Sequence, residues 1–94
     1  MDNDVITVLL ADDHAVVRYG LKAVLQTAPD ITVIGEATNG REAVDAAMRL
    51  KPDVVVMDLS MDIMDGAAAT RELQRLTSPA RILILTMHAE DEHL

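Results

Sequence analysis

The sequence predicts an α/β fold built on a doubly wound parallel sheet, and two features of the chain predict it. Short apolar runs that are typical of buried strands alternate with segments that have helical spacing. The intervening segments are about 10–15 residues long, which is enough for a helical crossover between parallel strands. At 94 residues, the chain is expected to form one small domain.

Four strands are expected. Three of them are apolar on successive residues, which indicates that both faces of the strand are covered and that it lies inside the sheet. The second strand contains Thr32, Gly35 and Glu36, which is typical of an edge strand. The predicted strands span Val5–Ala11, Ile31–Ala37, Asp53–Asp58 and Arg81–Met87.

Three helices are expected between these strands. The first begins near His14, and Pro29 ends it. Asn39, with Glu42 three residues later, is typical of the N-cap of the second helix, which Lys51-Pro52 closes. The residues expected to face the core are Val17, Leu21, Val24, Leu25 and Ala28 in the first helix, Ala43, Val44, Ala47 and Met48 in the second, and Leu73 and Leu76 in a third over Gly66–Leu76.

The composition excludes several classes of function. Sixteen acidic and eight basic residues give a net charge of −8, which disfavours direct binding to DNA. There is no cysteine, which excludes a disulfide framework and a thiolate metal site. Tyr19 is the only aromatic residue, which argues against a surface that stacks nucleic-acid bases. The apolar runs are far shorter than the roughly 20 residues that span a bilayer, and no secretory signal is recognisable, so we expect no membrane partner and a cytoplasmic location. The histidines at positions 14, 88 and 93 lack zinc-type spacing and are expected to be ordinary solvated residues.

Aspartates stand where two of the predicted strands end. Asp12 and Asp13 follow the first strand, and Asp58 ends the third. Parallel strands end at one edge of the sheet, where ligands bind, so these carboxylates converge if the two strands are neighbours. Three adjacent anions need a cation, and Mg²⁺ with its oxygen ligands suits them. Taken alone, the Asp-Asp pair would also fit a helix N-cap and a solvated loop residue.

Other polar residues are expected near the same edge. Thr86 ends the fourth strand, where its hydroxyl would reach a bound phosphoryl group, although an ordinary strand residue is the alternative. Asp62 and Asp65 lie in the loop after Asp58, and Asp65-Gly66 is typical of a turn and helix cap.

Three segments carry a family resemblance. They are "LLADDHAVVRYGLKAVL", "VVVMDLSMDIMDG" and "ILILTMH". In this order and spacing they resemble the receiver domains of two-component response regulators, most closely the NarL/FixJ (LuxR-type) branch. The resemblance covers residues 1–94 and implies a flavodoxin-like (CheY-like) sheet with strand order 2-1-3-4, in which the family's fifth strand and last helix are missing from this sequence.

The resemblance also implies roles for residues. A histidine kinase would phosphorylate Asp58 in a Mg²⁺-dependent transfer. Asp13, Asp58 and the backbone carbonyl of Ser60 would ligate Mg²⁺. Asp12 would act mainly through a bound water, and Thr86 would bond the phosphoryl group and act in the switch. The domain would not be an enzyme; its output would be transcription control through a C-terminal helix-turn-helix DNA-binding domain that lies outside this sequence.

The sequence departs from the family pattern at two places. Asp62 stands where proline is usual and adds a fourth carboxylate. The family's phosphate-binding lysine follows the missing fifth strand, and neither Lys22 nor Lys51 is assigned its role, so metal binding is the property expected to be retained. An uncovered fourth strand predicts either pairing with a second copy, as in a homodimer, or poor order past Leu85.

Two alternatives stay open from the residues. One is an interaction module that works without phosphorylation. The other is a Mg²⁺-dependent phosphatase like the haloacid dehalogenases, which also use an aspartate nucleophile after a strand. That class requires a second acid two residues after the nucleophile, where this sequence has Ser60.

Overall fold

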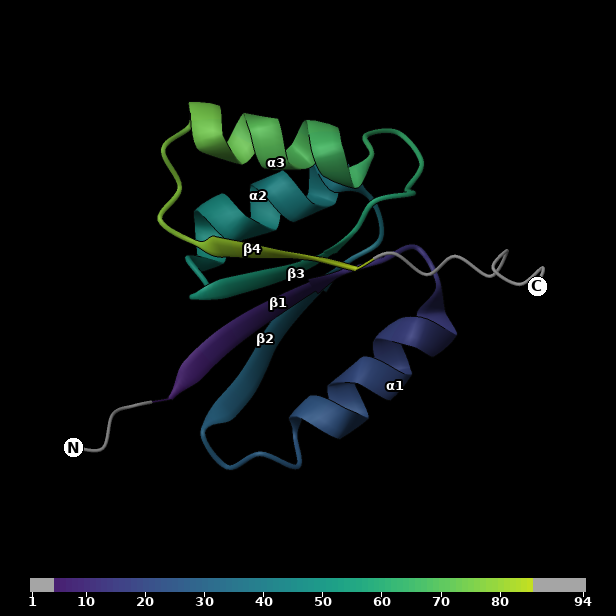
Figure 1. Ribbon diagram of the computed structural model, residues 1–94, viewed down its shortest axis with the longest axis vertical. Helices are drawn as coiled ribbons and strands as arrows, with labels where there is room; N and C mark the ends of the chain where they lie inside the picture. Colours follow the sequence, from purple (N-terminus) through teal and green to yellow (C-terminus); the bar gives the residue numbers. More distant parts are fainter. Residues whose placement is uncertain (1–4, 86–94) are drawn as a thin grey trace.

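The computed structural model describes residues 5–85 and shows a parallel sheet with helices on both faces (Figure 1). The sheet has four strands in the order β2-β1-β3-β4, which confirms the predicted α/β fold and strand order. The elements are β1 (Ile6–Ala11), α1 (Ala15–Leu25), β2 (Ile31–Ala37), α2 (Gly40–Leu50), β3 (Val54–Asp58), α3 (Gly66–Arg75) and β4 (Arg81–Leu85). Among residues 5–85, no helix is long and apolar enough to cross a membrane.

The central strands β1 and β3 bury side chains on both faces. Successive side chains of a strand point to opposite faces, so each strand contributes to two cores. Leu9 and Val55 belong to the core beneath α2 and α3, whereas Leu10 and Val56 belong to the core that α1 covers. Figure 1 shows α2 and α3 on one side of the sheet and α1 on the other. The continuous apolar runs of these strands follow from this double burial.

Helix α1 packs against the sheet with less of its surface buried than the sequence predicts. Within the described residues it is the only helix on its face of the sheet, and none of its residues is fully buried. Leu21 and Leu25 pack on the core, but Val24 is 67% exposed, so its predicted core position is wrong. In α2, Met48 is likewise 37% exposed, and Ala46 is buried instead. Helical spacing finds the apolar side chains but not the neighbours that would cover them.

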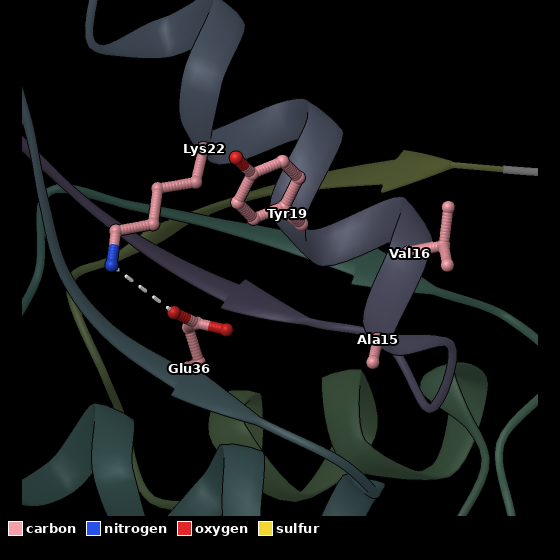
Figure 2. A pocket seen from close by; sticks show the side chains of 5 residues that line it. All are labelled: Ala15, Val16, Tyr19, Lys22 and Glu36. Carbon is pink, nitrogen blue, oxygen red and sulfur yellow. Dashed lines mark hydrogen bonds and ion pairs between the residues drawn. The ribbon is translucent and has the colours of Figure 1, made fainter.

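Polar contacts join α1 to the edge strand β2. The Glu36 carboxylate accepts from Arg18 Nε at 2.9 Å and from Lys22 Nζ at 3.5 Å. Figure 2 shows Lys22 reaching across to Glu36, with Tyr19 next to Lys22 on α1 and Val16 further toward the start of the helix. The hydrogen bond from Arg18 is the main cause that lowers the pKa of Glu36, so the carboxylate stays ionised.

Strand β4 forms one edge of the sheet described here. It pairs with β3 from Val54↔Arg81 to Asp58↔Leu85, and within residues 5–85 nothing pairs with its other side. Leu83 is 55% exposed, so this strand is not covered on both faces among residues 5–85, which agrees with the expected uncovered fourth strand. Self-association through this edge stays a prediction. The predicted strand end at Met87 and the order of the chain past Leu85 lie outside the described residues.

Two glycines lock the loop after β3 against the rest of the fold. Gly40, at the start of α2, donates its N–H to the carbonyl of Met64 at 2.8 Å, and Gly66 donates to the carbonyl of Leu59 at 2.9 Å. A Cβ atom at Gly40 would collide with the Met64 carbonyl, and one at Gly66 with the Asp58 carbonyl. Only glycine permits these close approaches of backbone to backbone.

Helix α2 begins as predicted. The Asn39 side chain accepts from the N–H of Glu42 at 2.9 Å, which satisfies one free donor of the first turn. The Glu42 carboxylate reaches back and accepts from the N–H and the hydroxyl of Thr38, both at 2.8 Å. These bonds to Thr38 lower the pKa of Glu42.

We therefore expect the cap of α2 to contribute less stability in acid. A carboxyl group whose pKa is lowered by folding stabilises the protein above its unfolded pKa of about 4.3, and this contribution is lost as the pH falls through the folded pKa. Glu42→Gln removes the titrating group. The wild-type protein should exceed the variant in thermal unfolding temperature at pH 7, with a gap that narrows toward pH 3. A gap that is the same at both pH values would contradict this prediction.

Candidate metal and phosphoacceptor site

The topology brings the predicted aspartates together. Strands β1 and β3 are neighbours, with Ala11 opposite Met57. The next residue of each strand segment is an aspartate, Asp12 and Asp58, so the two lie side by side at the carboxyl edge of the sheet. The expected convergence of strand ends is confirmed.

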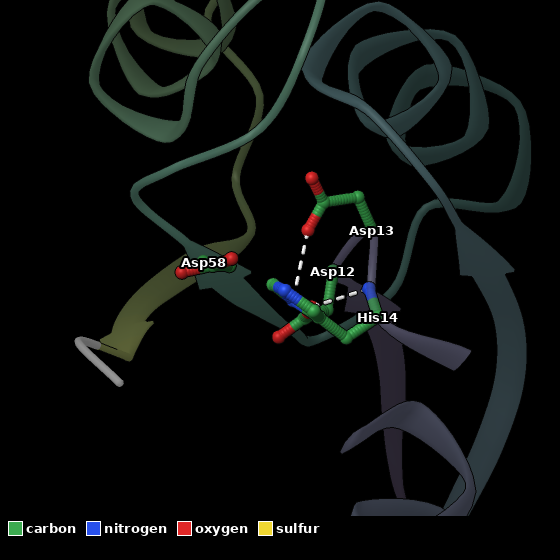
Figure 3. A group of neighbouring side chains, drawn as sticks. All are labelled: Asp12, Asp13, His14 and Asp58. Atoms are coloured by element: carbon green, nitrogen blue, oxygen red, sulfur yellow. Dashed lines mark hydrogen bonds and ion pairs between the residues drawn. The ribbon is translucent and has the colours of Figure 1, made fainter. Parts of the chain in front are cut away.

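Four side chains form a compact cluster at this edge (Figure 3). Each offers one ligand atom, and these atoms all lie within 4.8 Å of one another; the four residues are Asp12, Asp13, His14 and Asp58. Asp12 and Asp58 are 2% and 4% exposed, whereas Asp13 and His14 lie toward solvent. The cluster therefore has a buried anionic floor and an open side through which an ion can enter.

His14 is the member of this cluster that the sequence analysis missed. Its ring is exposed, as expected, but Nδ1 lies 2.9 Å from a carboxylate oxygen of Asp12 and 2.9 Å from one of Asp13. The hydrogen bond to Asp12, followed by the negative charge of Asp13, raises the pKa of His14. The imidazole thus offsets part of the local negative charge. A lone histidine next to Asp-Asp carries no spacing signal, so only the turn geometry reveals this contact.

The aspartate pair does not cap α1. His14 occupies the N-cap position, and its side chain makes no capping bond. Asp12 Oδ1 instead accepts from the backbone N–H of His14 at 2.8 Å, which closes a tight turn after β1. The alternative interpretation of Asp12 and Asp13 as a helix cap is therefore wrong.

One oxygen of the cluster has no partner. Asp12 Oδ2 is the only buried side-chain nitrogen or oxygen without a hydrogen bond among residues 5–85. A buried, unpaired carboxylate oxygen is costly, and a bound ion is one of the few ways to satisfy it. Together with the all-oxygen donors of Asp13 and Asp58, it fits a hard divalent cation.

The environment of Asp58 opposes its ionisation. Burial is the main cause that raises its pKa, and the charges of Asp12 and Asp13 act in the same direction. The N–H of Ser60, 3.4 Å from Oδ1, and the positive charge of His14 offset part of this. A cation at the cluster would favour the ionised carboxylate.

The loop after β3 supplies the outer wall of the site. Ser60 and Asp62 line an open cavity of about 510 Å³ together with Asp13 and His14. Asp65 lines it too, but its carboxylate accepts from the N–H of Ala68 at 2.8 Å, which confirms its predicted role as the cap of α3. Thr86 lies outside the described residues, as do His88 and His93.

An acidic cluster at the carboxyl edge of a 2-1-3-4 parallel sheet is the arrangement that the resemblance to receiver domains implies, and comparison with known families agrees. The model of the response regulator receiver domain matches residues 8–94. The chain belongs to this family.

Relatives and solved structures point to one branch of it. The chain is 51% identical over 87 residues to the transcriptional regulatory protein LiaR of Bacillus subtilis, covering 93% of this chain and 41% of LiaR. It is 44% identical over 89 residues to the response regulator VraR of Staphylococcus aureus, covering 95% of this chain and 43% of VraR. The chain thus spans about two fifths of the length of these relatives.

Solved receiver structures share the fold. The receiver domain of NarL from Mycobacterium tuberculosis superposes with a TM-score of 0.87 at 30% identity, covering 90% of this chain and 68% of that one. A LuxR-family response regulator from Aurantimonas gives 0.84 at 38% identity, with 89% and 60% covered. These similarities support the NarL/FixJ branch that the sequence motifs indicate.

Because three carboxylates crowd this edge, we expect Asp58→Asn to stabilise the metal-free protein. The raised pKa of Asp58 means that its ionisation costs stability, and stability is lost as the pH rises through the folded pKa. Each kcal/mol of relieved repulsion raises the unfolding temperature by about 4–8 °C in a domain of this size. The gain in unfolding temperature of Asp58→Asn over the wild type should be present at pH 7 with a chelator. It should shrink below pH 4, near the ordinary aspartate pKa of about 3.9.

Asp45→Asn is the matched control for this measurement. It makes the same change in net charge at a side chain that is 65% exposed on α2. An equal gain for both variants would mean that the net charge of the domain, rather than the crowded cluster, sets the effect.

Proposed function

We propose that this chain is the phosphoacceptor receiver domain of a two-component response regulator, in which a histidine kinase phosphorylates Asp58 with Mg²⁺ bound at the aspartate cluster. The observation that supports this proposal most directly is the aspartate cluster, in which the unpaired Asp12 Oδ2 lies beside Asp13 and Asp58. Family membership supports the same function.

In this proposal the residues divide the work of metal binding. Asp13 and Asp58 offer carboxylate oxygens directly, and the backbone carbonyl of Ser60 completes the protein ligands. Asp12 acts mainly through a water, for which its buried unpaired oxygen is a natural acceptor. Mg²⁺ keeps open positions for phosphate oxygens, and when bound it neutralises charge on the phosphoryl group.

The chemical step is a direct displacement at phosphorus. An oxygen of Asp58 forms a bond to phosphorus while the bond from phosphorus to the imidazole nitrogen of the donor phosphohistidine breaks. The departing nitrogen keeps the electron pair, and the product is an acyl phosphate on Asp58. Thr86 then bonds a phosphoryl oxygen and relays the change. Asp62, in the wall of the cavity, places a further negative charge near this group and would alter how long the phosphoryl group persists.

The output in this proposal is transcription control in the cytoplasm. LiaR is a transcriptional regulatory protein, and RcsB of Salmonella enterica, which has 28% identity and a TM-score of 0.81, has been solved bound to promoter DNA with a phosphomimetic. We infer that the full-length protein carries a C-terminal helix-turn-helix domain, because this chain covers only 41% of LiaR and an acidic receiver disfavours direct binding to DNA. The receiver would act as a signal carrier rather than an enzyme, and copies would pair in the active state.

Phosphorylation of Asp58 is tested by intact mass after incubation with acetyl phosphate and Mg²⁺. We expect the wild-type chain to gain one phosphoryl group and Asp58→Asn to gain none, because the amide is not a nucleophile in this reaction. Asp45→Asn, with the same chemical change on the exposed face of α2, should gain the group as the wild type does. Omission of Mg²⁺ should abolish the gain.

Other outcomes would identify the alternatives. Rapid turnover of acetyl phosphate without accumulation of the adduct would favour a phosphatase. No adduct in any variant, with Mg²⁺ bound, would favour an interaction module that does not use phosphorylation. An adduct that persists in Asp58→Asn would place the phosphoacceptor elsewhere and contradict the proposal.

A further inference from the structure

Arg18 connects three parts of the fold at the base of the acidic site. It lies in the first half of α1, and its side chain is only 16% exposed despite its charge. Its Nη1 donates to the backbone carbonyl of Asp12 at 2.8 Å, and its Nε donates to Glu36 Oε1 of β2 at 2.9 Å. The planar guanidinium can hold both acceptors at once, which an ammonium group cannot do with the same geometry.

The carbonyl that Arg18 binds belongs to the peptide between the two site aspartates. The other side of Asp12 is also fixed, because its N–H donates to the carbonyl of Ala37 in β2 at 3.0 Å. The backbone of Asp12 is therefore held by β2 on one side and by Arg18 on the other. Rotation of the Asp12–Asp13 peptide would redirect both carboxylates, so these two bonds set the directions in which they point.

Glu36 makes this arrangement specific. It binds Arg18 and Lys22 together, so the guanidinium is oriented by an acceptor that itself has two cationic partners. The consequence is a continuous path of bonds from the edge strand β2, through Glu36 and Arg18, to the backbone of the metal-binding turn. Residues that orient ligands without touching the metal commonly affect its affinity by about 10–100-fold.

We propose that Arg18 is a positioning residue of the cation site, which holds the Asp12–Asp13 peptide in the orientation that binds the metal. This inference rests on the proposed Mg²⁺ site. It makes a prediction opposite in sign to simple electrostatics. Removing a positive charge beside a cation site should strengthen metal binding by charge alone, whereas loss of positioning should weaken it.

The test is Mg²⁺ binding by calorimetry to the whole chain at low temperature, with metal-free thermal unfolding measured in parallel. We expect Arg18→Ala and Arg18→Lys each to weaken Mg²⁺ affinity by about tenfold, since lysine keeps the charge but not the two-acceptor geometry. Arg41→Ala is the matched control, because Arg41 makes an exposed ion pair with Asp45 on α2. Its affinity should stay within about twofold of the wild type.

Each outcome separates the explanations. Tighter or unchanged Mg²⁺ binding by Arg18→Ala would overturn the inference. In particular, a lowered unfolding temperature with unchanged Mg²⁺ affinity of the folded variant would indicate a purely structural role for Arg18. If Arg18→Ala does not fold, Arg18→Lys decides the test, and lysine binding Mg²⁺ as the wild type does would overturn the inference. Failure of the wild-type chain to bind Mg²⁺ would instead contradict the proposed function.

Discussion

The repulsion among carboxylates at the ends of β1 and β3 is the constraint on which the rest of the structure depends. The two strands are neighbours, so Asp12 and Asp58 are forced together in a place that water hardly reaches. The protein offsets this charge only in part, with the His14 ring and the N–H of Ser60. One oxygen of Asp12 is left without a partner, and a metal-free site of this kind is held together at a cost in stability.

The structure around the cluster holds the carboxylates in place despite this cost in stability. Strand β1 is packed on both faces. The loop after β3 is locked to α2 at Gly40, and where α3 begins, Gly66 lies closely against the end of β3. On the remaining side, the Arg18–Glu36 pair ties the turn after β1 to the edge strand. The ligand groups are therefore held by three separate parts of the fold, and a cation would find most of its ligands already in place. Such preorganisation favours binding because little ordering remains to be done.

Much of this could be predicted from the sequence, for identifiable physical reasons. Continuous apolar runs indicate strands buried on both faces, and the position of Asp12 and Asp58 at the strand ends follows from the shared direction of parallel strands. The caps Asn39 and Asp65 were predictable because their bonds are local. These features depend only on short stretches of chain.

What could not be predicted depends on neighbours in space. Val24 and Met48 have helical apolar spacing, yet the described structure leaves Val24 67% exposed and covers Met48 only in part. The bridging of two carboxylates by His14, and the reach of Arg18 to the Asp12 carbonyl, follow from the conformation of one turn and the angle of α1. Residue type and spacing carry no information about either.

The most direct test of the account is where a divalent ion binds. Mn²⁺ favours the same oxygen ligands as Mg²⁺ and broadens the NMR signals of nearby nuclei. In a ¹H–¹⁵N spectrum of the chain, substoichiometric Mn²⁺ should selectively remove the amide signals of Asp12, Asp13 and Asp58, and excess Mg²⁺ should restore them. Broadening centred instead on the separate acidic surface of Glu42 and Asp45, or spread evenly over the protein, would contradict the account.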